Sequence, residues 1–150
     1  MELEQMRERI LSTPLVQKLP EGMRLRFAMI LLGFAETREV AREEQIFKQG
    51  DRDAGTGCII IEGMVRIITE EDNSKTIEAP DILGEVQIFT PDRVRTATVE
   101  VVVGGKILVF SWKEVGAASQ EIFSADEMKA FRKVIAESAW TREKSVFEKK

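Results

Sequence analysis

Residues 58–69 read CIIIEGMVRIIT, and they show most clearly how the middle of the chain folds. β-Branched side chains dominate both ends of this stretch, and such side chains suit the pleated geometry of a strand. Glu62-Gly63 lies between the two runs and has the composition of a tight turn. The stretch therefore predicts two short strands joined by a hairpin turn at Glu62-Gly63.

Four neighbouring segments also show strand patterns: residues 38–49, 76–79, 96–103 and 106–111. The first ends on Gly50-Asp51, a strong turn signal, and the last two flank a predicted hairpin turn at Gly104-Gly105. Many short strands separated by turn signals are typical of closed rolls and sandwiches. We therefore predict an α+β fold that is mostly β, an eight-stranded β-roll (double-stranded jelly roll) over about residues 38–115.

Apolar residues at helical spacing surround the predicted roll. Short helices are expected within about residues 2–35, where proline and glycine interrupt the apolar pattern. Beyond the roll, Ser124 and Glu127 form a capping box ahead of one long helix over about residues 125–147. One side of that helix is apolar and consists of Met128, Phe131, Val134 and Ile135. We expect a single domain over residues 1–150.

Composition places the chain among ordinary soluble proteins. Of its 150 residues, 43% are hydrophobic and 32% are charged, and this length suits one domain. The N-terminus lacks the apolar core of a signal peptide, and no apolar run approaches the roughly 20 residues that cross a bilayer. Cys58 is the single cysteine, which excludes a disulfide within the chain. We therefore expect a cytoplasmic protein with no membrane partner.

Charge and the lack of histidine narrow the function. A net charge of −4 has the wrong sign for binding bulk nucleic acid, and no helix-turn-helix pattern follows the long helix. With no histidine and one cysteine, a His/Cys metal cluster is impossible and the commonest general base is missing. We therefore expect no metal, no cofactor, no direct nucleic-acid partner and no enzymatic activity.

A distinct chemical pattern occupies residues 83–99, LGEVQIFTPDRVRTATV. Gly84 lets the backbone approach a ligand closely, and amides that open a short helical turn form a small anion site. Arg95 can add a forked, charge-assisted contact to phosphate. Glu85 would repel that phosphate, but its carboxylate accepts well from a neighbouring sugar hydroxyl. An anion contact beside a sugar contact describes a nucleotide.

This stretch resembles the signature of the cyclic nucleotide-binding domain family, which includes the bacterial catabolite activator and the regulatory subunits of protein kinase A. The family pattern is F-G-E, a short loop and then R-x-A-T-V, and this chain has L-G-E at residues 83–85 and R-T-A-T-V at residues 95–99. The segments IFKQGD at 46–51 and IIIEGMV at 59–65 resemble the two other glycine landmarks of the family. The resemblance covers about residues 15–147.

The resemblance implies a role for each matching residue. Arg95 would pair with the cyclic phosphate, and Glu85 would hold the ribose 2′-hydroxyl. The residues that would surround these contacts are Gly84, Val86, Thr96 and Ala97. In the final helix, Trp140 and Thr141 stand where family members cover the base, by stacking or by a hydrogen bond.

Other interpretations of these residues stay open. Glu85 also suits the first turn of a short helix. Arg93 would replace Arg95 as the phosphate contact if the loop register differed. Trp140 also suits a core or an interface, and Cys58 suits a plain buried thiol.

Two functions follow from these patterns. The first is a sensory module that binds cAMP or cGMP and signals through its C-terminal helix to a protein partner that the sequence does not name. The second is a degenerate domain that serves protein interaction or dimerisation without a nucleotide. Gln87 and Pro80 favour the second, because nucleotide-binding family members keep small residues there. A homodimer is expected through the apolar side of the final helix, since family members often pair through it.

Overall fold

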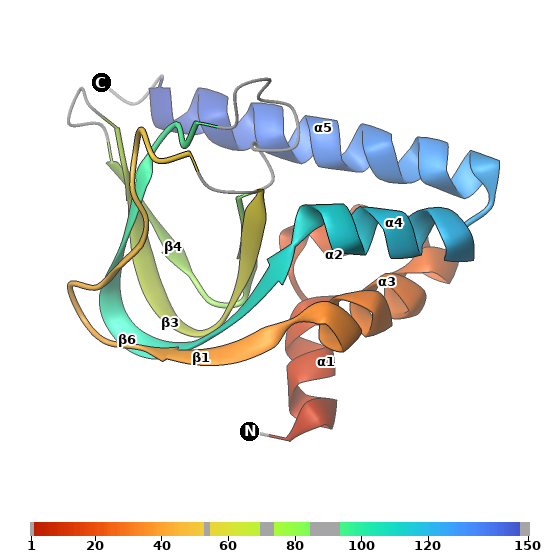
Figure 1. Cartoon of the computed structure of the whole chain (residues 1–150), viewed down its shortest axis with the longest axis horizontal. Helices are drawn as coiled ribbons and strands as arrows, with labels where there is room; N and C mark the ends of the chain where they lie inside the picture. The colour runs from red at the N-terminus through yellow and green to blue at the C-terminus, as the bar shows by residue number, and fades with distance from the viewer. Residues whose placement is uncertain (1, 53–54, 70–73, 85–93, 148–150) are drawn as a thin grey trace.

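The computed structural model describes the backbone of residues 2–52, 55–69, 74–84 and 94–147, with side chains as far as residue 138. Its helices are α1 (Leu3–Leu11), α2 (Pro14–Gln17), α3 (Glu21–Phe34), α4 (Trp112–Ile122) and α5 (Ala125–Phe147). Its strands are β1 (Glu36–Val40), β2 (Gln45–Phe47), β3 (Thr56–Ile68), β4 (Ser74–Glu78), β5 (Asp81–Leu83) and β6 (Thr98–Ser111). Helices therefore precede and follow a run of strands, as predicted (Figure 1).

The strands form one antiparallel sheet that curls on itself (Figure 1). β3 and β6 pair along their whole length, from Thr56 opposite Ser111 to Ile68 opposite Thr98. β1 and β2 add to β6, whereas β4 and β5 add to β3. The two long strands are therefore the frame of the roll, and each carries two shorter strands.

Glycines bend both long strands near the middle of their pairing. The register shifts repeatedly around Gly63, whose φ is +110°. A Cβ atom at Gly105 would lie 2.1 Å from the carbonyl oxygen of Glu62, so the two backbones approach too closely for any side chain. Both segments nevertheless remain within their strands, and the hairpin turns predicted at Glu62-Gly63 and Gly104-Gly105 are wrong. A bulge and a hairpin both use glycine at positive φ, so the local signal at Gly63 is the same for both. At Gly105 the close approach of the Glu62 carbonyl requires glycine instead.

The bends let each long strand serve in two parts of the roll. One half of β3 pairs with β5 and the other half with β4, and β6 is shared in the same way between β1 and β2. The predicted β-roll with flanking helices is confirmed. The described residues form a six-stranded sheet, whereas eight strands were predicted. β3 and β6 are each one continuous strand where two strands and a turn were predicted.

Two apolar clusters lie on opposite faces of the curled sheet. Successive side chains of a strand point to opposite faces. In β3, Cys58 and Ile60 belong to the cluster inside the roll, whereas Ile59 and Ile61 belong to the cluster between the sheet and the helices. Both faces of this part of β3 are buried, which explains its unbroken apolar run.

The roll ends at Ser111 and not at about residue 115, because α4 begins at the next residue. The Ser111 hydroxyl accepts a hydrogen bond from the Glu114 amide at 3.4 Å, which caps the helix. Trp112, Val115 and Ser119 are its buried residues, and their spacing is helical. This helix was missed, although both of its signals are present in the sequence. None of the helices in the described part of the chain is long and apolar enough to cross a membrane.

The predicted capping box of α5 is confirmed. The Ser124 amide donates to Glu127 Oε1 at 3.0 Å, and the Glu127 amide donates to Ser124 Oγ at 3.1 Å. Phe131 meets Phe27 of α3 edge to face, with 5.1 Å between the ring centroids. The other members of the apolar side are buried in the same cluster: Met128, Val134 and Ile135. This side of α5 belongs to the core of the chain and is not available for the homodimer contact placed there.

An ion pair joins α3 to α5 beside that capping box. Arg26 Nη1 lies 3.2 Å from Glu127 Oε1, and its guanidinium lies 5.0 Å from the centroid of the Phe123 ring. The hydrogen bond from Arg26, followed by that from the Ser124 amide, holds the pKa of Glu127 below its ordinary value. The Glu127 carboxylate therefore favours the folded state only while it is charged.

We expect Glu127→Gln to destabilise the protein near neutral pH and to cost nothing in acid. A carboxyl with a lower pKa in the folded chain stabilises the fold above its unfolded pKa, and this contribution is lost as the pH falls through the folded pKa. Glutamine keeps one oxygen as the capping acceptor, and it removes the charge and the second acceptor that Arg26 uses. Urea unfolding of both proteins, at neutral pH and between about pH 5 and pH 3, measures the difference. A difference that does not change with pH would contradict this account.

Candidate ligand-binding site

The residues predicted to bind a ligand lie where β5 ends and where the chain enters β6. Gly84 directly follows β5, and Arg95, Thr96 and Ala97 directly precede β6. Thr96 and Ala97 are half-buried, and Ala97 packs against the cluster inside the roll. The structure thus brings these four residues to one end of the roll.

Several predicted residues have no described position. Residues 85–93 lie outside the described part of the chain, and they include Glu85, Val86, Gln87 and Arg93. The backbone of Trp140 and Thr141 belongs to α5, as predicted, but their side chains also lie outside the described part. The sugar contact and the base cover therefore remain predictions.

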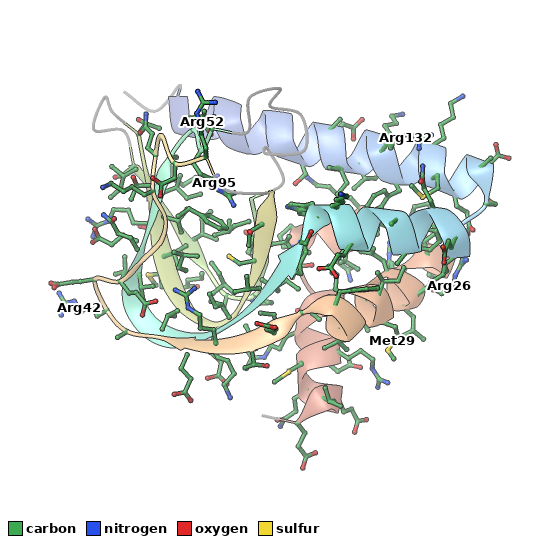
Figure 2. All side chains as sticks on the ribbon, viewed as in Figure 1. Arg26, Met29, Arg42, Arg52, Arg95 and Arg132 are labelled. Carbon is green, nitrogen blue, oxygen red and sulfur yellow. The ribbon has the colours of Figure 1, made fainter. Side chains whose placement is uncertain are left out.

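Arg95 is buried at the centre of this site, with 3% of its surface exposed. Its Nη2 atom donates a hydrogen bond to the carbonyl oxygen of Thr56 at 2.7 Å. The guanidinium carbon lies 3.8 Å from the centroid of the Phe47 ring, within cation–π range. Figure 2 shows Arg95 at the upper end of the roll, whereas Arg42 projects outward at its lower left. Most arginines beside a strand are solvated surface charges, whereas Arg95 is buried.

The backbone of Arg95 is also held on both sides. Its amide donates to the Asp51 carbonyl at 2.9 Å, and its own carbonyl accepts from the Gly50 amide at 2.9 Å. Arg52 and Val94 form an antiparallel bridge next to these bonds. The backbone of Arg95 is therefore held by hydrogen bonds to Gly50 and Asp51, where a turn was predicted.

Gly84 lies close to the backbone of β3 and to the Arg95 side chain. Its φ is +93°, and a Cβ atom there would lie 2.9 Å from the Thr56 carbonyl oxygen and 3.3 Å from Arg95 Nη1. Its carbonyl accepts a hydrogen bond from Trp112 Nε1 at 3.2 Å. Gly84 therefore connects the arginine, the start of β3 and the start of α4.

Sequence reasoning did not single out Phe47, Thr56 or Trp112 as part of this site. Phe47 lies in IFKQGD, a segment that was noted only for its glycine. Thr56 reaches the site because Cys58 pairs with Leu83, which aligns the start of β3 with the end of β5. That register joins segments far apart in the chain, and no local pattern reports it.

The arrangement suits an oxyanion. A guanidinium is planar and always charged, and it donates in a fork that matches phosphate oxygens. Away from water its hydrogen bonds gain strength, since the effective dielectric constant is lower. The cluster inside the roll, which includes Phe47, supplies such surroundings. The described part of the site therefore places a buried guanidinium beside an apolar ring, an arrangement whose chemistry suits an anion.

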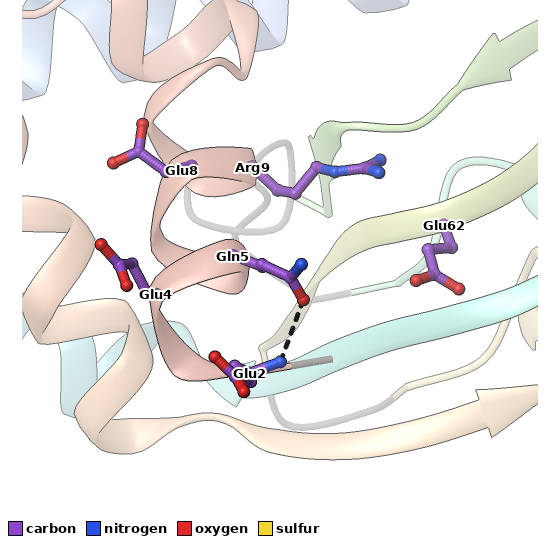
Figure 3. A pocket seen from close by; sticks show the side chains of 6 residues that line it. All are labelled: Glu2, Glu4, Gln5, Glu8, Arg9 and Glu62. Atoms are coloured by element: carbon purple, nitrogen blue, oxygen red, sulfur yellow. Dashed lines mark hydrogen bonds between the residues drawn. The ribbon is translucent and has the colours of Figure 1, made fainter.

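Two hollows elsewhere on the described part of the protein do not share this chemistry. One of about 760 Å³ lies beside α1 (Figure 3) and is lined by Glu2, Glu4, Gln5, Glu8, Arg9 and Glu62. Its carboxylates repel an anionic ligand. Another of about 440 Å³ lies between α3 and α4 and is mostly apolar, with Leu25, Met29, Phe34 and Ile122 in its lining. Neither of these two hollows is lined by Arg95 or Gly84.

Residues 37–121, more than half of the chain, match the sequence model of a family described as the cyclic nucleotide-binding domain. The match begins at the second residue of β1 and ends in α4, so it contains all of the roll except Glu36. No curated protein sequence matches this chain.

Solved structures share the fold at low sequence identity. The c-di-GMP-responsive global regulator CLP of Xanthomonas campestris is 19% identical with a TM-score of 0.65, over 82% of this chain and 61% of the regulator. The N-terminal domain of a transcriptional regulator from Streptomyces coelicolor is 17% identical with a TM-score of 0.64, over 96% of this chain and 95% of that domain. The regulatory domain of Toxoplasma gondii PKA with cAMP is 16% identical with a TM-score of 0.61, over 76% of this chain and 43% of that one. This chain thus spans about three fifths of the Xanthomonas regulator.

Proposed function

This chain belongs to the cyclic nucleotide-binding domain family, and from that premise we propose that it is a regulatory module whose ligand is cAMP or cGMP. In this proposal, Arg95 pairs with the cyclic phosphate and Glu85 holds the ribose 2′-hydroxyl. The residues around these contacts are Gly84, Val86, Thr96 and Ala97, and the residues that cover the base are Trp140 and Thr141. The module has a cytoplasmic location and no catalytic role.

The burial of Arg95 is the observation that carries the proposal. Removing a charged group from water costs several kcal/mol unless other interactions offset the loss. A surface arginine avoids this cost, yet Arg95 is 3% exposed and its backbone is held by Gly50 and Asp51. The fold thus places a guanidinium where an anion gains most from it. A cyclic phosphate is an anion of the right charge and shape for this donor.

The contact between Trp112 and Gly84 supports a route for the signal. Gly84 adjoins the ligand segment, and its carbonyl accepts from Trp112 at the first position of α4. α4 in turn packs against α5. A ligand that shifts Gly84 therefore acts on α4 through a direct hydrogen bond, and we propose that α5 passes the change to a partner protein.

A degenerate domain without a nucleotide is the second candidate. The observation in its favour is that the Arg95 guanidinium already has partners within the chain, the Thr56 carbonyl and the Phe47 ring. In this case Arg95 stabilises the end of the roll, and the helices serve protein contacts. Binding measurements separate the two candidates.

We expect Arg95→Leu to weaken cAMP or cGMP binding by roughly 30-fold or more. Truncating one partner of a buried charge pair costs about 2–5 kcal/mol, and each 1.4 kcal/mol is about tenfold in affinity. Isothermal titration calorimetry of both proteins with cAMP, cGMP and c-di-GMP measures the change. Thermal unfolding gives a second readout, because a ligand at about 100 times its Kd stabilises the folded state by about 2.7 kcal/mol.

Arg42→Leu is the matched control. Arg42 is exposed and lies in the connection between β1 and β2, away from the arginine site (Figure 2). We expect it to bind as the unmodified protein does. Equal losses in both variants would mean that Arg95 is not the phosphate contact. Absence of binding by the unmodified protein to cAMP and cGMP would exclude the first candidate and leave the second.

A further inference from the structure

We propose that Phe47 is a positioning residue, which holds the Arg95 guanidinium in the orientation that receives the ligand phosphate. The inference rests on the proposed function, since it names a residue that prepares the same site. It starts from one contact, the 3.8 Å between the guanidinium carbon and the centroid of the Phe47 ring.

The position of Phe47 is fixed by the fold. It ends β2, pairs with Val99 at the start of β6 and is 8% exposed within the cluster inside the roll. Just beyond β2, the Gln49 amide donates to Thr98 Oγ1 at 3.0 Å. The ring is therefore anchored to the same strand that Arg95 precedes. Its face offers a rigid apolar platform for a flat cation.

The platform and the Thr56 carbonyl act on different parts of the guanidinium. The ring lies 3.8 Å from the guanidinium carbon, whereas the carbonyl accepts from an edge of the group, at Nη2. The two contacts therefore restrain the guanidinium at two different places. An arginine side chain loses considerable rotamer freedom when it binds, and a side chain that is already held loses less. Phe47 thereby raises affinity without touching the ligand.

The test compares variants that keep or remove the ring. In Phe47→Leu the site stays apolar but loses its aromatic face, whereas Phe47→Tyr keeps that face. Ile77→Ala is the control for general loosening of the roll, because Ile77 is also 8% exposed in the same cluster. Ile77 pairs with Val65, at the far end of β3 from Thr56. Should Phe47→Leu fail to fold, Phe47→Met replaces it, since methionine adapts to irregular core gaps.

Calorimetry with cAMP and cGMP gives the first readout. We expect Phe47→Leu to lower the affinity roughly tenfold, in line with a desolvated cation–π contact. Phe47→Tyr and Ile77→Ala should bind within about threefold of the unmodified protein. Unchanged or tighter binding by Phe47→Leu would overturn the proposal, because the ring would then be idle or would hold Arg95 away from the ligand. An equal loss in Ile77→Ala would overturn it as well.

A ligand-free readout separates this inference from the proposed function. Protons above an aromatic ring resonate upfield, so the NMR signals of the Arg95 side chain report the contact directly. We expect the upfield shift in the unmodified protein and in Phe47→Tyr, and its loss in Phe47→Leu. If no nucleotide binds but this pattern appears, the proposed function fails while the positioning of Arg95 by Phe47 stands. Identical Arg95 signals in all three proteins would overturn the positioning role.

Discussion

Phe131→Ala is expected to lower the free energy of unfolding by about 3–5 kcal/mol, the usual cost of deleting a buried aromatic side chain. Phe131 is 6% exposed, and its ring lies 5.1 Å from that of Phe27 and 6.4 Å from that of Phe123, centroid to centroid. The substitution removes the ring contact of α5 with Phe27 of α3 and leaves a cavity there, whereas the ion pair of Arg26 with Glu127 remains. Domains are stable by only about 5–15 kcal/mol, so much of the total is lost. Urea unfolding followed by circular dichroism measures the change.

Arg132→Ala is the control, since Arg132 is the next residue of α5 and is exposed. It should change stability by no more than about 0.5 kcal/mol. The mass of both variants in solution completes the test. A Phe131→Ala protein of unchanged stability and reduced mass would show that this side chain lies in a dimer interface and not in the core of the chain.

Gly105→Ala is expected to destabilise the roll by about 3 kcal/mol or more, at or above the upper end of the usual cost of overpacking. The new Cβ atom would lie 2.1 Å from the carbonyl oxygen of Glu62 and 3.0 Å from the amide nitrogen of Gly63. Both neighbours are backbone atoms of β3, so they can move only if the pairing of β3 with β6 opens. Thermal unfolding should show a lower Tm, and amide hydrogen exchange should increase across this pairing.

Gly116→Ala is the control, because it makes the same substitution of glycine by alanine at a position where no strand lies close. Gly116 lies inside α4, and a Cβ atom there would have nothing within 4 Å. Alanine favours a helix over glycine by about 0.5–1 kcal/mol, so this variant should be slightly more stable. Equal behaviour of the two variants would contradict the close approach of the strands at Gly105.

The strand β3, which approaches Gly105 so closely, also positions the proposed ligand site. β3 is held against β5 by the pairing of Cys58 with Leu83, and Gly84 follows directly. This register brings the Thr56 carbonyl to the side of Arg95, where it receives the hydrogen bond from Nη2. We therefore expect a loss of pairing in the roll to weaken ligand binding as well as stability.

Much of the fold was predictable from local pattern. The β-branched run after Cys58 predicted a strand, the capping box of Ser124 and Glu127 located the start of α5, and turn signals indicated a roll. The motif of residues 83–99 also placed Gly84 and Arg95 in one site, and the structure brings them close together, since a Cβ atom at Gly84 would lie 3.3 Å from Arg95 Nη1. Each of these signals depends on residues close in sequence, because strand geometry, helix capping and turns make the same demands on side chains in many folds.

Only the tertiary structure decided three further points. Gly63 and Gly105 read as hairpin turns, but the pairing of β3 with β6 along their whole length makes them bends in continuous strands. From the sequence, the apolar side of α5 with Phe131 suits a dimer contact as well as a core, and the structure shows that α3 covers it. Phe47 became the platform of Arg95 because β2 pairs with β6. In each case the local pattern specifies only that a surface is apolar or that the backbone turns. Which strand, helix or side chain lies against it is decided by contacts between residues far apart in the sequence.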